Sequence, residues 1–281
     1  MKLFNFYQDN ELHLGVTDGQ RYVDVNRCGY PVTMMDVIAD RSGLHRENVA
    51  RILKHGKPLT QAVHFAPPVI APEKILCVGL NYAEHTAETQ LEKPAYPALF
   101  SKFNNALNAH NHPIILPDTA SHYDYEAELV IVIGHAARKV SLEDAPKYIF
   151  GYTAGNDFSA RDLQLRTTQW LLGKTPDGFA PIGPCITTAD ELDPAALQIR
   201  SYVNGELRQD GNTRDMIFDC ATIVSYISQY LTLKPGDLIF TGTPKGVIMG
   251  YPKDRQNWLK SGDIVTVEIE GIGSLTTPLH E

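Results

Sequence analysis

The sequence predicts an α+β fold rich in β-structure, with a small N-terminal domain (residues 1–70) and a larger domain (residues 71–281). After the proline-rich stretch Phe65–Pro72, most segments are short and apolar, and glycine or proline separates them, as in strands joined by tight turns. The stretch itself has three prolines and no helical period, which is typical of an extended connector. Two similar segments, Leu233–Ile239 and Leu259–Val265, each combine a Gly-Asp turn with the start of a strand.

The N-terminal domain is expected to combine short strands with two helices. A helix is predicted from a cap at Thr33 to about Ala39, because Asp36 follows the cap by three residues. A second helix is predicted near Glu47–His55, and the glycine that follows ends it. Two segments alternate weakly between apolar and polar residues, as half-buried strands do: Leu12–Val16 and Arg21–Val25.

One long helix is predicted in the larger domain, from about Met216 to Leu231. Asp215 and Asp219 suit the positive N-terminal end of such a helix. Apolar residues recur along it near helical spacing: Ile217, Ala221, Val224 and Ile227.

Composition and charge argue against several classes of partner. The chain has 281 residues and a formal net charge of −8, so we expect neither a nucleic acid nor an anionic membrane as a partner. No apolar run approaches the roughly 20 residues that span a bilayer, and no secretory signal follows Met1. We therefore expect a cytoplasmic protein. Its four cysteines form no C-x-x-C pair and suit a reducing compartment: Cys28, Cys77, Cys185 and Cys220.

Two glutamates, Glu126 and Glu128, precede the apolar run Leu129–Ile133, which has the length and composition of a buried strand. Side chains two residues apart on a strand point to the same face. Two carboxylates held together beside apolar residues repel each other and lose hydration. A divalent cation such as Mg²⁺, Mn²⁺ or Ca²⁺ would compensate. The alternative is a strand edge with two solvated acids.

Asp157 is a third candidate ligand, because it ends a short strand-like segment and precedes a polar turn. Three acidic ligands leave room on Mg²⁺ or Mn²⁺ for water and substrate oxygens. The alternative for Asp157 is the N-cap of a following helix.

A candidate proton-transfer pair follows the predicted strand Ile75–Val78. If the segment is helical, His85 and Glu88 lie on one face at i and i+3. A carboxylate bonded to an imidazole orients the ring and raises its basicity, so the pair could take a proton from water. Glu84 or Glu92 could be the partner instead, and a solvated surface pair remains the structural alternative.

Two other patterns do not indicate a site. Thr241–Gly246 is rich in glycine but lacks the P-loop spacing, and the chain has no Rossmann fingerprint. His110, His112 and His122 lie among asparagine and proline, which favours a turn over a zinc site.

Taken together, these segments resemble the fumarylacetoacetate hydrolase family, and the resemblance extends from about Glu73 to Leu279. Glycine-rich turns around Lys174 and after Val203 also fit. The motifs occur in the family's order: Gly79-x-Asn-Tyr-x-x-His85-x-x-Glu88, Tyr125-Glu126-x-Glu128-Leu, Asn156-Asp157-x-Ser-Ala-Arg161-Asp-x-Gln164 and Thr241-Gly-Thr243-Pro-x-Gly246.

The resemblance implies a role for each motif. Glu126, Glu128 and Asp157 would hold Mg²⁺ or Mn²⁺, with Ca²⁺ as an alternative. The dyad of His85 and Glu88 would activate water on a lid over the site. The family's fold is a mixed β-roll or distorted barrel with a small N-terminal domain, commonly in a homodimer. Four residues would surround the carboxylate and oxo groups of the substrate: Lys174, Arg161, Gln164 and Thr243.

The chemistry of these residues suits a 2-oxo acid. The metal would act as a Lewis acid that stabilises an enolate. Lys174 would place a positive charge where oxyanion character develops, an effect whose loss typically costs about 3 kcal/mol.

The leading hypothesis is a metal-dependent hydrolase of a C–C bond in a β-diketo acid, such as fumarylpyruvate, another acylpyruvate or a 2,4-diketo-3-deoxy sugar acid. Oxaloacetate decarboxylation and 2-oxo-diacid isomerisation use the same kind of enolate and are the alternatives. A non-catalytic oxo-acid-binding protein is more remote, because the sequence keeps both the dyad and Lys174.

Overall fold

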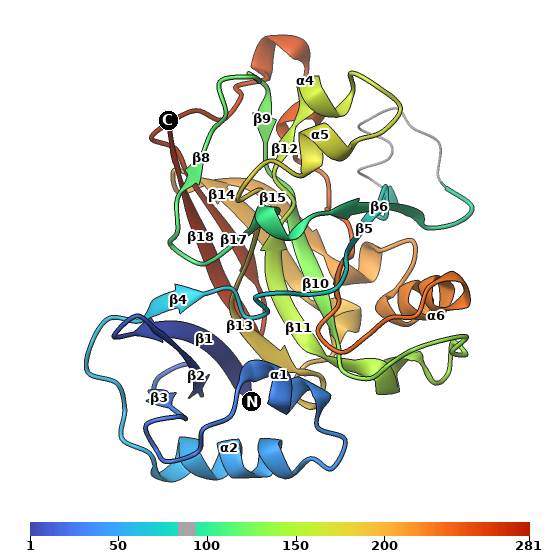
Figure 1. Ribbon diagram of the computed structural model, residues 1–281. Coiled ribbons are helices and arrows are strands. Elements are labelled where there is room, and N and C mark those ends of the chain that lie inside the picture. The colour runs from blue at the N-terminus through green and yellow to red at the C-terminus, as the bar shows by residue number, and fades with distance from the viewer. Residues whose placement is uncertain (84–93) are drawn as a thin grey trace.

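The computed structural model of the protein describes residues 1–83 and 94–281. It confirms the β-rich α+β class, with few helices and several mixed sheets that do not close into a barrel. The arrangement is shown in Figure 1. Among the described residues, the α-helices are α1 (Met34–Ala39), α2 (Leu44–His55), α4 (Arg161–Gln164), α5 (Leu171–Lys174) and α6 (Cys220–Tyr230).

One large sheet runs through the molecule in the order β3-β2-β1-β13-β11-β10-β16-β5-β6, with β4 beside β1 and β7 beside β13. Its strands are β1 (Lys2–Gln8), β2 (Glu11–Thr17), β3 (Tyr22–Asp24), β4 (His64–Ala66), β5 (Ile75–Gly79), β6 (Ala98–Lys102), β7 (Leu107–Asn108), β10 (Ala127–Ile133), β11 (Ile149–Asn156), β13 (Ala180–Thr188) and β16 (Leu238–Phe240).

Two smaller sheets complete the fold. The five-stranded sheet has the order β15-β14-β17-β18-β8, and the two-stranded sheet pairs β12 with β9. Their strands are β8 (Ile114–Ile115), β9 (Tyr123–Asp124), β12 (Ser159–Ala160), β14 (Gln198–Val203), β15 (Glu206–Asn212), β17 (Ile264–Ile269) and β18 (Gly273–His280).

The central strands β10 and β11 are buried along their whole length. Because successive side chains point to opposite faces, β10 contributes to two cores. Leu129 and Ile131 pack in a cluster with residues of α6 and the five-stranded sheet. Val130 and Val132 pack in a second cluster with α1 and the N-terminal strands.

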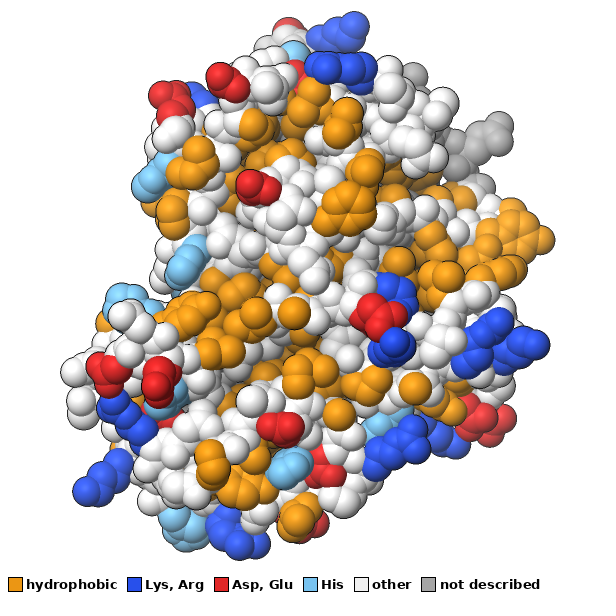
Figure 2. All heavy atoms as spheres, viewed as in Figure 1, with side chains coloured by type: hydrophobic (Ala, Val, Ile, Leu, Met, Phe, Trp, Pro, Cys, Tyr) orange, Lys and Arg blue, Asp and Glu red, His pale blue; other side chains and the backbone are white. Residues whose placement is uncertain are grey.

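The N-terminal part is joined to the rest by the sheet itself. β1 pairs antiparallel with β13, with Lys2 opposite Thr187 and Leu3 opposite Ile186. In Figure 2, hydrophobic side chains form a band across the middle of the face shown, where the N-terminal part meets the rest of the molecule. No helix among the described residues is long and apolar enough to cross a membrane.

The predicted helices are found, with changes at two starts. Thr33 caps α1, and Asp36 completes the capping box. The second helix begins at Leu44, earlier than predicted. The predicted start of the long helix at Met216 is wrong, because α6 begins at Cys220.

The later start of α6 has a physical cause in Asn81. The Asn81 carbonyl accepts a hydrogen bond from Ile217 N–H (2.7 Å), and its side-chain oxygen accepts one from Phe218 N–H (2.8 Å). These bonds hold the two residues outside a helix. Asp219 then caps the helix by accepting from Thr222 N–H (2.7 Å).

Candidate metal and substrate site

Three carboxylates meet where β10 begins and β11 ends. One oxygen from each of Glu126, Glu128 and Asp157 lies within 4.8 Å of the others, and all three residues are buried. β10 and β11 are antiparallel neighbours, with Ala127 opposite Asn156. This pairing brings residues 126 and 157 to the same end of the sheet, where Asp157 N–H donates to the Glu126 carbonyl (3.0 Å).

The structure shows that both alternatives for these acids, a solvated strand edge and an N-cap, are wrong. Glu126 and Glu128 have 6% and 2% exposure, so they are not a solvated edge. Asp157 is not an N-cap, because the helix that follows, α4, has Ala160 at that position. The carboxylates therefore need cationic partners.

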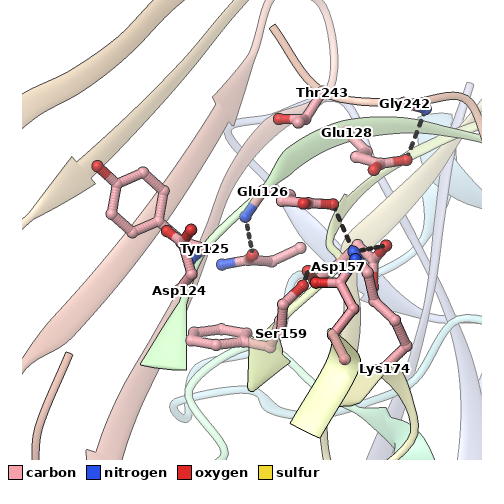
Figure 3. A network of polar contacts seen from close by, with 12 residues as sticks. Asp124, Tyr125, Glu126, Glu128, Asp157, Ser159, Lys174, Gly242 and Thr243 are labelled. Atoms are coloured by element: carbon pink, nitrogen blue, oxygen red, sulfur yellow. Dashed lines mark hydrogen bonds and ion pairs between the residues drawn. The ribbon is translucent and has the colours of Figure 1, made fainter. Parts of the chain in front are cut away.

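Lys174 supplies one of these positive charges. Its Nζ lies 2.8 Å from Glu126 Oε2 and 2.7 Å from Asp157 Oδ2. In Figure 3 the side chains of Glu126, Asp157 and Lys174 point toward one another. Burial acts to lower the pKa of Lys174, but the carboxylates of Asp157 and Glu126 outweigh it and the pKa is raised. Lys174 therefore carries its charge in this site.

Lys102, at the end of β6, is a second buried cation that sequence reasoning missed. Its Nζ pairs with Asp157 Oδ1 and donates to the Phe158 carbonyl (3.0 Å). Burial lowers its pKa, and the Asp157 carboxylate opposes this only in part. The only sequence signal is a lysine at the end of an apolar strand, which by itself usually marks a solvated residue.

Arg161 is the third cation of the site. Its Nη1 lies 2.7 Å from Glu126 Oε1 and donates to Gln164 Oε1 (2.9 Å). Its Nε donates to Asp124 Oδ2 (2.8 Å). Burial acts to lower the pKa of Arg161, but the carboxylates of Asp124 and Glu126 raise it.

Glu128 has the least compensation of the three carboxylates. Its Oε2 accepts a hydrogen bond from Gly242 N–H (2.7 Å), which Figure 3 shows, and it has no ion pair with another described residue. Burial, followed by the charges of Asp157 and Glu126, raises its pKa well above the ordinary value.

Thr243 joins the site through its backbone position rather than through a free hydroxyl. Its Oγ1 donates to the Ala127 carbonyl (2.9 Å) and accepts from Gln209 Nε2 (2.8 Å). It lines the cavity described next, but its hydroxyl proton is already donated.

A cavity of about 70 Å³ opens over this cluster. Its polar side is formed by Glu126, Glu128 and the four predicted substrate residues. Most of the rest of the lining is apolar, and Trp170 packs edge-on against Phe100 with ring centroids 5.4 Å apart. The other apolar lining residues are Val78, Leu80, Leu165 and Met249. The predicted dyad residues, His85 and Glu88, lie outside the described residues.

The residues present fit a divalent cation. With all groups ionised, Asp124, Glu126, Glu128 and Asp157 give four negative charges, and Lys102, Lys174 and Arg161 give three positive ones. The buried cluster thus has one negative charge in excess. Glu128 is the acid without an ion pair among the described residues. All-oxygen donors of this kind suit Mg²⁺ or Mn²⁺.

Comparison with known proteins identifies the class. Residues 74–280 match the model of the fumarylacetoacetate (FAA) hydrolase C-terminal domain, an enzyme family. The chain belongs to this family.

Relatives resemble it over nearly its whole length. Oxaloacetate tautomerase Fahd2a, mitochondrial, from Rattus norvegicus is 39% identical over 283 residues, which cover 97% of this chain and 90% of the relative. The structure of a fumarylacetoacetate hydrolase from the psychrophilic Exiguobacterium antarcticum has a TM-score of 0.88 and 37% identity, covering 100% of this chain and 99% of that one.

A third relative was solved with ligands. Maleylpyruvate hydrolase from Sphingobium sp. SYK-6, in complex with manganese(II) and pyruvate, has a TM-score of 0.82 and 32% identity, with both chains covered completely.

Proposed function

We propose that the protein is a divalent-metal-dependent enzyme that interconverts the keto and enol forms of a 2-oxo diacid such as oxaloacetate. The buried cluster of Glu126, Glu128 and Asp157, with Lys174 and Arg161 beside it, is the observation that carries this proposal. The near full-length likeness to an oxaloacetate tautomerase favours isomerisation over the hydrolysis expected from the motifs.

Glu126, Glu128 and Asp157 would hold Mg²⁺ or Mn²⁺, which would supply Lewis-acid polarisation of the 2-oxo group. Lys174 Nζ would donate to the substrate oxygen on which negative charge develops, because this ammonium is buried and stays protonated. Arg161 and Gln164 would orient the carboxylate. The apolar wall that includes Trp170 would keep water away from the enolate.

A second candidate is hydrolysis of an acylpyruvate, which was the leading hypothesis from the sequence. The structural likeness to a maleylpyruvate hydrolase that binds manganese and pyruvate supports it. This reaction needs an activated water, for which His85 and Glu88 are the predicted groups. Tautomerisation needs no water, so both reactions can share the site.

The test is a substrate panel with purified protein that is stripped of metal and reloaded with Mn²⁺. We expect loss of the enol absorbance of fresh oxaloacetate to accelerate with Mn²⁺ and to return to the uncatalysed rate with chelator. If the protein cleaves maleylpyruvate or fumarylpyruvate faster than it removes the enol of oxaloacetate, the hydrolase is favoured. Enzyme activity that survives complete metal removal would contradict both candidates.

The variant His85→Ala separates the two reactions. We expect it to abolish any cleavage of an acylpyruvate, because that step needs activated water, and to spare much of any oxaloacetate tautomerisation or decarboxylation, which do not need it. Leu172→Ala is the matched control, since this side chain is 60% exposed and does not line the cavity. Equal loss of both activities in His85→Ala would show that His85 does not distinguish them.

A further inference from the structure

Asp124, at the end of β9, is a buried carboxylate outside the predicted site. Its Oδ2 accepts hydrogen bonds from Arg161 Nε (2.8 Å) and Met249 N–H (3.1 Å). Its Oδ1 accepts from Tyr125 N–H (2.9 Å) and Ile248 N–H (2.8 Å). One side chain on β9 thus contacts the neighbouring Tyr125, α4 and the turn at residues 248–250.

Two of the three guanidinium nitrogens of Arg161 are already engaged. Nε donates to Asp124, and Nη1 contacts Glu126 and Gln164. The third nitrogen, Nη2, is buried and has no hydrogen-bond partner among the described residues. Because a guanidinium is planar, fixing Nε and Nη1 also fixes the direction of Nη2.

This free donor belongs to a residue that lines the cavity. A buried N–H without a partner is costly unless a ligand completes it. An anionic oxygen of a bound 2-oxo acid is the group that would do so, since arginine matches carboxylates well.

The same carboxylate also holds part of the apolar wall. Met249 lines the cavity, and its N–H donates to Asp124. Ile248 packs in the cluster that surrounds Phe158 and Phe179. Asp124 itself does not line the cavity.

We propose that Asp124 is a positioning residue, which aims Arg161 Nη2 at an anionic oxygen of the substrate and holds Met249 in the apolar lining of the cavity. This inference rests on the proposed function only in that the substrate is a 2-oxo acid anion. Asp124 acts through Arg161, so its removal weakens binding of the anion more than it changes the metal site.

The experiment measures by calorimetry how tightly the Mn²⁺-loaded protein binds oxalate, an unreactive analogue of a 2-oxo acid. For Asp124→Asn we expect the Kd of oxalate to rise by about tenfold to a hundredfold, the range for one hydrogen bond to a charged group. KM for the substrate should rise in parallel, while kcat falls less. The Mn²⁺ affinity without oxalate should stay within about twofold of wild type.

Asp237→Asn is the matched control. Asp237 is also fully buried and accepts from Lys74 N–H (2.9 Å) and Lys234 N–H (2.8 Å), but it lies in a turn that does not line the cavity. A merely structural loss of a buried carboxylate would affect both variants. We expect Asp237→Asn to lower thermal stability and leave the Kd of oxalate unchanged.

A double-mutant cycle with Arg161→Lys tests whether Asp124 acts through Arg161. Lysine keeps the positive charge, but its ammonium group lacks the planar set of donors of a guanidinium. It therefore cannot contact Asp124 and Glu126 and also direct a third donor in the same plane. Arg161→Lys alone should weaken oxalate binding. Adding Asp124→Asn to it should change the Kd by less than about twofold, because the residues act as one unit.

Three results would overturn the inference: unchanged oxalate affinity in folded Asp124→Asn, unchanged affinity in Arg161→Lys, or full additivity in the double variant. If Asp124→Asn does not fold, Asp124→Glu, which keeps the charge and moves it by one methylene, is judged by the same thresholds. Wild-type protein that binds oxalate but converts no substrate of the panel would contradict the proposed function and leave the role of Asp124 standing. Wild-type protein that does not bind oxalate would contradict both.

Discussion

Glu128 shows how a single residue of the site can lower the stability of the metal-free protein and still favour the binding of a metal ion. Burial and the neighbouring carboxylates raise its pKa well above the ordinary value of 4.5. A raised carboxyl pKa means that ionisation at neutral pH costs folding free energy. A bound divalent cation would offset this cost.

Glu128→Gln should therefore stabilise the metal-free protein and weaken metal binding. The glutamine can still accept from Gly242 N–H but carries no charge. We expect a higher urea midpoint without metal at neutral pH. We also expect Mn²⁺ affinity, measured by electron paramagnetic resonance, to fall by more than about tenfold, since even the partners of metal ligands are worth that much. A lower urea midpoint together with unchanged Mn²⁺ binding would contradict this account.

Lys102 carries a second prediction at this scale. Lys102→Met leaves Asp157 without one of its two buried cations, and breaking a buried ion pair typically costs about 3–5 kcal/mol. Urea unfolding of the metal-free protein should show a loss of this size. Lys147→Met is the control, because its pair with Asp144 is exposed, and its urea midpoint should match that of wild type.

The sequence predicted some of these residues and missed others for a physical reason. Glu126 and Glu128 are two residues apart on one strand, so a local rule brings them together. Lys102 meets Asp157 across 55 residues and Asp124 meets Arg161 across 37. No local spacing encodes such pairs, which arise from strand order.

At the scale of elements, the two short helices α4 and α5 hold two of the three cations of the site, Arg161 and Lys174. They approach so closely at Gly173 that a Cβ there would lie 2.4 Å from Gln164 N and 2.5 Å from the Ala160 carbonyl oxygen. Backbone atoms cannot yield to such contacts, so any larger residue must move α5.

Gly173→Ala should therefore displace Lys174, the next residue of α5. We expect a loss of stability of about 1–3 kcal/mol, the usual cost of overpacking, together with a large loss of kcat. Steady-state kinetics and urea unfolding measure both. Leu172→Ala, an exposed position on the same helix, serves as the control. Wild-type kcat in Gly173→Ala would mean that the position of α5 does not set the activity.

His110 connects two elements and predicts a dependence of stability on pH. Its ring packs against Phe65 of β4, with centroids 5.1 Å apart, and its Nδ1 accepts a hydrogen bond from Thr276 N–H of β18 (3.1 Å). Burial lowers its pKa below the ordinary value of 6.5. The folded state then resists protonation, so stability is complete above the unfolded-state pKa and is lost as the pH falls through the folded-state pKa.

We expect the free energy of unfolding to fall more in wild type than in His110→Asn when the pH is lowered from about 7.5 to about 5.5, where histidine gains its charge. Urea titrations of both proteins at several pH values measure the difference. Because other groups titrate in both proteins, only the difference reports on His110. Parallel curves would contradict the assignment.

Elements with local signals were predicted well. The two Gly-Asp turns are alike in the structure: Asp237 Oδ2 accepts from Lys234 N–H (2.8 Å), and Asp263 Oδ2 accepts from Lys260 N–H (2.9 Å). The start of α6 was missed because it depends on Asn81, which is distant in the sequence and joins residues 217 and 218 through hydrogen bonds.

For the whole molecule, turn and strand patterns predicted the β-rich class, but they could not predict the order of the strands. β5 lies beside β16, and β1 lies beside β13, which are pairings between distant segments. The boundary near residue 70 stays a prediction. What the structure adds is that one sheet crosses it, and one hydrophobic cluster contains Leu3 and Val16 together with Val130 and Ile186.

This continuity predicts that the two parts fold as one unit. Removing residues 1–70 would expose the edge of β13 and the apolar side chains that pack against β1, and exposed edges of this kind promote aggregation. We expect a chain of residues 71–281 to be aggregated or to lack a cooperative transition.

The full chain should unfold in a single step, with far-ultraviolet circular dichroism and the fluorescence of Trp170 and Trp258 changing together. Leu3→Ala should shift both curves equally, because Leu3 is fully buried in the shared cluster. Two separate transitions, or a shift in the circular dichroism curve alone, would show that the N-terminal part folds independently.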